Sequence, residues 1–80
     1  MNGSRDGSRA LALALKAAVT TDAAAEMLVC PPFVYLPAVR EWLGASPIGL
    51  GAQDVAEQGG DGAYTGEVSG RMLLDVGCRY

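Results

Sequence analysis

The 80-residue sequence predicts an α/β fold in which helices alternate with short parallel strands. Three observations support this prediction: two short apolar stretches have the composition of buried strands, segments with helical spacing surround them, and glycine or proline marks most boundaries. Half of the residues are apolar, so the chain has enough apolar side chains to pack a core. The order helix, strand, helix, strand, loop, helix is typical of βα units around a parallel sheet.

Residues 10–19 are predicted to form the first helix. The leucines of this stretch alternate with other residues as in a strand, but Ala, Leu and Lys favour a helix, and only Val19 is branched at Cβ. Ser4 or Ser8 can cap the helix, because a short hydroxyl accepts hydrogen bonds from the free N–H groups of a helix start. Thr20–Ala24 is predicted to end it.

The next three elements are a strand, a helix and a second strand. The first strand is predicted at Met27–Cys30, where two prolines stop it because they cannot continue a ladder of hydrogen bonds. The helix that follows contains Pro37, so it must begin near residue 34 or later, and Gly44 ends it. The second strand is predicted at Ile48–Gln53, where the glycines indicate crowding by neighbouring backbone.

A long loop, Asp54–Gly66, follows the second strand. Ser69 is expected to cap a third helix, which Gly77 ends, and Cys78–Tyr80 has the character of the start of a further element. Two parallel strands with open edges make a poor sheet, and parallel sheets are normally covered on both faces. We therefore expect the chain to be a piece of a larger protein.

Composition and charge argue against several classes of function. Six basic and nine acidic residues give a net charge of −3, and no basic stripe is present, so we expect no nucleic-acid partner. The apolar stretches are too short to span a membrane. Two distant cysteines without a C-x-x-C motif, and no secretory signal, indicate a cytoplasmic protein with free thiols. The chain has no histidine, which excludes a Ser-His or Cys-His nucleophile and a His-ligated metal from these residues.

No active site can be assembled from the residues alone. The sequence GLGAQD at 49–54 is a weak match to the dinucleotide fingerprint, and GGDGAYTG at 59–66 lacks the lysine of a phosphate-binding loop. Glu57, Asp61 and Glu67 share one loop, but carboxylates in a glycine-rich loop are expected to be solvated rather than paired for acid–base chemistry.

Four segments, in order and spacing, resemble the triosephosphate isomerase family: MNGS at 1–4, CPPFVYLPAVREWL at 30–43, IGLGAQDV at 48–55 and GAYTGEVSGRMLLDVGCRY at 62–80. The resemblance implies a partial (β/α)8 TIM barrel that covers helix 1 through helix 3 with strands 2 and 3. Residues 1–80 are then a fragment of one barrel domain. It also implies a cofactor-free isomerase of glycolysis and gluconeogenesis, which interconverts dihydroxyacetone phosphate and glyceraldehyde 3-phosphate.

The resemblance places the catalytic groups of the family outside these residues. The family uses a glutamate base, a neutral histidine and a lysine, and it is itself a standard worked case of such pKa tuning. Only Met1–Gly3 remains of the family motif Asn-Trp-Lys-Met-Asn-Gly, and the histidine and the glutamate would follow Tyr80. We therefore expect no catalytic or substrate-binding residue in the chain, and no activity from the chain alone.

The resemblance also implies a homodimer, in which the third loop enters the other subunit. The residues that it places in this dimer-interface loop are Gln53, Thr65, Gly66 and Glu67. Met1 and Asn2 are implied to flank the pocket that receives the partner's loop. The segment AEQGGD at 56–61 departs from the family pattern. The alternative hypothesis is a small non-catalytic α/β module that folds alone and binds a protein partner through its 54–68 loop.

Overall fold

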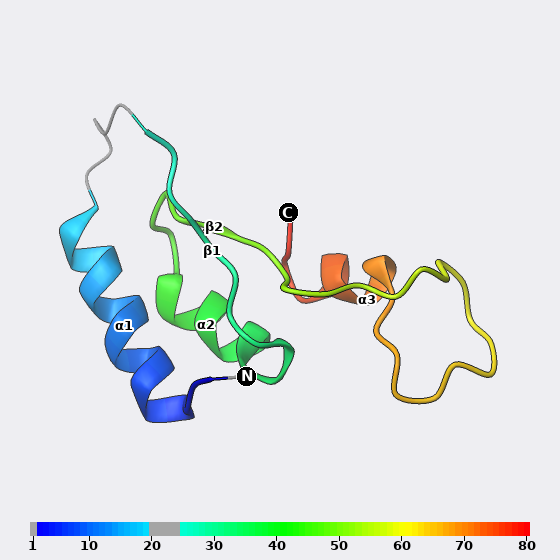
Figure 1. Ribbon diagram of the computed structural model, residues 1–80. Helices are drawn as coiled ribbons and strands as arrows, with labels where there is room; N and C mark the ends of the chain where they lie inside the picture. The colour runs from blue at the N-terminus through cyan, green and yellow to red at the C-terminus, as the bar shows by residue number, and fades with distance from the viewer. Residues whose placement is uncertain (1, 20–24) are drawn as a thin grey trace.

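The computed structural model describes residues 2–19 and 25–80 of the chain. Its elements are α1 (Arg5–Ala18), β1 (Leu28–Val29), a 3₁₀ helix η1 (Phe33–Tyr35), α2 (Leu36–Leu43), β2 (Gly49–Leu50) and α3 (Gly70–Asp75). This is the predicted order of helices and strands (Figure 1). The prediction that Thr20–Ala24 ends the first helix falls outside the described residues, and α1 itself ends at Ala18.

Serine caps position the first and third helices. The Ser4 hydroxyl accepts a hydrogen bond from the Gly7 amide at 3.0 Å, so α1 begins five residues earlier than the predicted range of 10–19. At α3, the Ser69 hydroxyl accepts from the Met72 amide at 3.3 Å, as predicted. Both helix starts therefore follow from local hydrogen-bond chemistry that the sequence displays.

The second helix also obeys its local signals. Pro37 lies in the first turn of α2, where a backbone N–H has no partner within the helix, and a turn of 3₁₀ helix precedes it. Gly44, with a φ of 54°, follows the last residue of α2, and its amide donates to the Arg40 carbonyl at 3.1 Å. The predicted start and stop of this helix are confirmed.

The sheet is parallel but short. Leu28 lies opposite Gly49 and Val29 opposite Leu50. Both strands are shorter than the predicted ranges, because the apolar sequence continues beyond the residues that pair. Their helical connection, through η1 and α2, is that of a βα unit.

The last residues extend the sheet on the other side of β2. The Arg79 amide donates to the Leu50 carbonyl at 2.9 Å, and the Tyr80 carbonyl accepts from the Ala52 amide at 3.0 Å. The further element that the sequence predicts after Gly77 therefore lies along β2. In the described part of the chain, β1 pairs only with β2.

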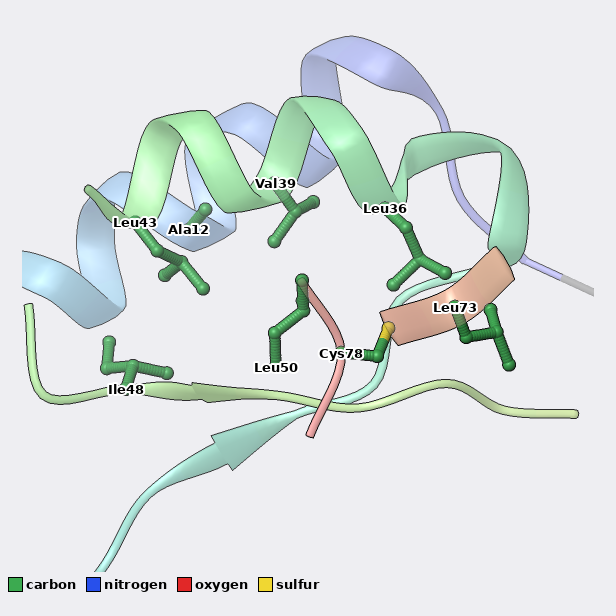
Figure 2. Packing of buried hydrophobic residues seen from close by; sticks show 8 residues of the cluster. All are labelled: Ala12, Leu36, Val39, Leu43, Ile48, Leu50, Leu73 and Cys78. Carbon is green, nitrogen blue, oxygen red and sulfur yellow. The ribbon is translucent and has the colours of Figure 1, made fainter. Parts of the chain in front are cut away.

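The core lies between the two strands and the two longer helices. Figure 2 shows its buried side chains pointing into this space from α1, α2, β2, α3 and the C-terminal segment. They are Ala12, Leu36, Val39, Leu43, Ile48, Leu50, Leu73 and Cys78. The Arg5 guanidinium stacks 5.3 Å from the centre of the Trp42 ring and adds a cation–π contact between α1 and α2.

The opposite face of the strands is open. The side chains of Leu28 and Tyr80 are 44% and 67% exposed on this side. Gly51 has the predicted crowding, because a Cβ atom there would come within 2.8 Å of the Cys30 sulfur and 3.2 Å of the Tyr80 carbonyl oxygen. One face of the sheet is thus covered by helices, while the other carries apolar side chains over which residues 2–19 and 25–80 form no layer.

Candidate functional site

The segment 54–68 projects away from the packed helices, and every residue from 59 to 67 within it is exposed (Figure 1). The Ala56 amide donates to the Val68 carbonyl at 2.8 Å and closes its base. Immediately before it, the Gln53 side-chain amide donates to the Cys30 carbonyl at 2.8 Å. The loop therefore starts from a point that is tied to the end of β1. We refer to residues 54–68 as the projecting loop.

A tight turn at Tyr64–Glu67 presents the residues that the resemblance singled out. The Glu67 amide donates to the Tyr64 carbonyl at 3.0 Å, and Gly66 has a φ of 91°. A hydrogen bond of this kind, with a left-handed glycine at the third position, is the arrangement of a type II turn. Thr65, Gly66 and Glu67 are all exposed, so the turn offers its side chains to solvent or to a partner.

One ion pair joins the middle of the projecting loop to α3. The Arg71 guanidinium on α3 donates to the Asp61 carboxylate at 2.6 Å, and both side chains are exposed. Next to Asp61, a Cβ on Gly62 would come within 2.7 Å of the Tyr64 ring, so the ring lies directly over this glycine. An open hollow of about 140 Å³ lies between the loop and α3.

The acidic residues of the loop are predicted to be solvated, and their exposure agrees with this. Glu57, Asp61 and Glu67 are exposed. Sequence reasoning missed the partner of Asp61, because Arg71 lies ten residues away across a glycine-rich segment with no periodic pattern. The only signal in the sequence is an acidic residue in the loop and a basic residue in the helix that follows it.

A second hollow, of about 520 Å³, lies between α1 and β1. Most of its lining is apolar, and it includes Leu11, Leu15 and Val29. Asn2 and Gln53 also line it, so the structure brings together a residue that the resemblance places beside the receiving pocket and one that it places in the interface loop. Met1 lies outside the described residues. The Thr65–Glu67 turn is not part of this hollow, which we call the α1–β1 groove.

The thiols are free, and one of them is held in its neutral form. Burial raises the pKa of the Cys78 thiol, with a smaller contribution from the Cys30 thiol. A raised pKa lowers the fraction of nucleophilic thiolate, so Cys78 is a core residue rather than a reactive one. Among residues 2–19 and 25–80, no three or more Cys, Asp or Glu side chains are grouped to hold a metal ion. No helix in the described ranges has the length and apolar character needed to cross a membrane.

The sequence of the chain matches one known protein family over its whole length. The triosephosphate isomerase family model matches residues 1–80. Over 80 residues, the chain is 45% identical to the triosephosphate isomerase of Nitrosococcus oceani, 48% to that of Alcanivorax borkumensis and 50% to that of Thiobacillus denitrificans. Each match covers 100% of this chain but 32%, 30% and 31% of the relative, so the chain spans about a third of their length. The resemblance of the four sequence segments is therefore confirmed, and the chain belongs to the triosephosphate isomerase family.

Proposed function

We propose that this chain forms helices 1–3 and strands 2 and 3 of a triosephosphate isomerase barrel. The complete enzyme would interconvert dihydroxyacetone phosphate and glyceraldehyde 3-phosphate. The observation that carries the proposal is the family match over all 80 residues, at 45–50% identity to three isomerases. In this assignment β1 and β2 are barrel strands 2 and 3, Cys78–Tyr80 begins strand 4, and residues 1–80 belong to a single barrel domain.

The shape of the chain supports a place within a larger barrel. Its radius of gyration is 13.7 Å, whereas a compact domain of this length has about 12 Å. The edge of β1 is unpaired in the described residues, and the apolar α1–β1 groove runs beside it. Leu28 and Tyr80 leave apolar surface exposed on the open face of the sheet. Neighbouring strands of a closed barrel would cover these surfaces.

The proposed contribution of this chain to the enzyme is assembly rather than proton transfer. The reaction needs a base and an electrophile at the substrate, and we assign both to residues outside 1–80, with no cofactor. The projecting loop would enter the second subunit of a homodimer, with Thr65, Gly66 and Glu67 at its leading turn. Asn2, with Met1, would flank the pocket that receives the same turn from the partner. The exposed type II turn and the Gln53 anchor support this role.

Two free cysteines fit a reducing compartment, so we place the enzyme in the cytoplasm.

A chimera tests the proposal directly. In it, residues 1–80 replace the stretch that they match in the Nitrosococcus oceani isomerase, and the rest of that enzyme supplies the remaining two thirds. We expect a dimer with isomerase activity within about tenfold of the parent, because the substituted residues hold no proposed catalytic group. A folded, dimeric chimera without activity would contradict the proposal.

The 80-residue chain alone distinguishes the alternative. As an isolated piece of a barrel it should show isomerase activity at background and no cooperative melting by circular dichroism. A compact monomer on gel filtration that melts cooperatively would instead favour a small module that binds a partner through the projecting loop. Measurable turnover by the chain alone would show that a catalytic site lies within these residues.

A further inference from the structure

The projecting loop is loosely held between its base and its turn. Its base is closed by the hydrogen bond between Ala56 and Val68. Farther out, a Cβ atom at Gly59 or Gly60 would find nothing within 4 Å. Glycine has the widest choice of backbone conformations, so this stretch gives the turn beyond it little rigidity. Something else must hold Thr65–Glu67 if the turn is to keep one position.

The Asp61–Arg71 ion pair is placed to do this. Arg71 is the second residue of α3, and the Ser69 cap fixes the start of that helix. Asp61 lies three residues before the turn that begins at Tyr64. The 2.6 Å contact therefore joins a fixed helix to the middle of a glycine-rich loop. It is the only ion pair within the described ranges of the chain, and its length is that of a charge-assisted hydrogen bond.

The Tyr64 ring carries the restraint from Asp61 toward the turn. It lies over Gly62, the residue between Asp61 and Ala63, where any side chain would meet the ring at 2.7 Å. Tyr64 also provides the carbonyl that accepts the hydrogen bond of the turn. Fixing the position of Asp61 therefore also limits the movement of the turn, through the contact of the Tyr64 ring with Gly62 and the hydrogen bond from Glu67 to Tyr64.

We propose that Asp61 and Arg71 are positioning residues, whose ion pair holds the Thr65–Glu67 turn in its projecting conformation and so sets how tightly the loop binds a second subunit. The part of this proposal that concerns binding rests on the proposed function, whereas the part that concerns loop order does not. Exposed pairs contribute little to global stability, so the effect is on the conformation of the loop rather than on folding. It should also depend on salt, because both groups are exposed.

The test compares loop variants within the chimera. Asp61→Asn removes the charge at constant size, Asp61→Arg with Arg71→Asp reverses the pair, and Glu57→Gln is the matched control. Glu57 is an exposed acid of the same loop that forms no ion pair with the described residues. The measurements are hydrogen exchange of the Glu67 amide by NMR, the dimer dissociation constant by analytical ultracentrifugation, and the melting temperature.

We expect Asp61→Asn to raise the Glu67 exchange rate and the dimer dissociation constant each by about threefold, within the range for exposed pairs. The reversed pair should restore both values, and Glu57→Gln should change neither. In about 1 M NaCl, where the Debye length is about 3 Å, the difference between Asp61→Asn and the parent should become smaller, because the charges are partly screened even at contact distance. The melting temperature should fall by no more than about 2 °C, the shift that threefold weaker dimerisation alone produces, whereas a pair that held the fold would lower it further.

Each outcome separates the two proposals. Faster exchange without a change in dimer affinity would keep the role in loop order and overturn the role in assembly. An inactive chimera whose Glu67 exchange still responds to Asp61→Asn would contradict the isomerase proposal alone. Unchanged exchange in Asp61→Asn, or no restoration by the reversed pair, would overturn the positioning role. If this chimera does not fold, the same exchange comparison in a chimera with the Alcanivorax borkumensis isomerase decides the question.

Discussion

The packed region around α1, α2 and the strands differs from the projecting loop in what holds it. In the packed region, burial fixes each element: Leu36 is 0% exposed, and Val39, Leu43 and Leu50 are each below 7%. In the loop, every residue from 59 to 67 is exposed, and the contacts are a hydrogen bond at the base, a turn and one ion pair. One chain therefore uses non-directional burial in one region and directional polar contacts in the other.

The two kinds of contact suit different tasks. Apolar burial contributes a large stabilisation in proportion to area and accepts many side-chain combinations, so it can hold a fold. A few hydrogen bonds and a turn hold a defined shape on an exposed segment at small net stabilisation, so such a segment can also form new contacts. The difference predicts that substitutions in the packed region change folding, whereas substitutions in the loop change association.

The largest expected effect is at the centre of the packed region. Leu36→Ala should lower the free energy of unfolding of the chimera by about 2–5 kcal/mol, because it removes buried methyl groups and leaves a cavity. Urea denaturation measures this. The matched control is Val34→Ala, two residues away, where the side chain is 70% exposed and the change should stay within about 0.5 kcal/mol. Equal losses at the two sites would mean that α2 is not covered as the structure shows.

The sequence predicts the packed region well because its signals are local. Ser4, Ser69, Gly44 and Gly77 mark helix ends through hydrogen bonds and backbone angles within one turn of themselves. Strand lengths were overestimated, because the number of paired residues depends on the neighbouring strand and not on the apolar stretch itself.

The structure of the projecting loop is harder to predict from local sequence signals. Its existence and its exposed acids follow from composition, and the resemblance singled out its turn. The Asp61–Arg71 pair and the Gln53–Cys30 hydrogen bond do not follow, because each joins residues ten or more positions apart without periodicity. Whether Gln53, Thr65, Gly66 and Glu67 contact a partner stays a prediction, since it depends on a surface outside this chain.

Two glycines sharpen the comparison, because they share a backbone conformation in different regions. Gly77, after α3, has a φ of 98°, and Gly66, in the loop turn, has a φ of 91°. Alanine in the left-handed region costs about 1–2 kcal/mol at either site. Gly77→Ala should lower the free energy of unfolding by at least this amount, since α3 carries the buried Leu73 and a Cβ atom at Gly77 would also come within 2.5 Å of the Arg40 side chain, which must move.

Gly66→Ala should instead leave the unfolding of the dissociated subunit almost unchanged and weaken the dimer, because the strain falls on a turn that can open without exposing the core. The dimer dissociation constant of the chimera should rise by about fivefold to thirtyfold, which corresponds to the same 1–2 kcal/mol. Gly60→Ala is the control in the loop, since its φ is not left-handed and a Cβ there would find nothing within 4 Å. A Gly66→Ala protein that loses global stability but not dimer affinity would reverse the roles of the two regions.

The smallest expected effect is the pH dependence of stability that the buried Cys78 contributes, and it tests whether water is excluded from the packed region. Cys78 is buried, and burial raises the pKa of its thiol above the value of about 8.5 that it has when unfolded. Below that pH the thiol is protonated in both states, so it adds no pH dependence. Above it the unfolded chain ionises first, so stability should fall as pH rises toward the folded pKa. The measurement is the loss of stability between pH 7 and 9.5, and Cys78→Ala should remove this part of it.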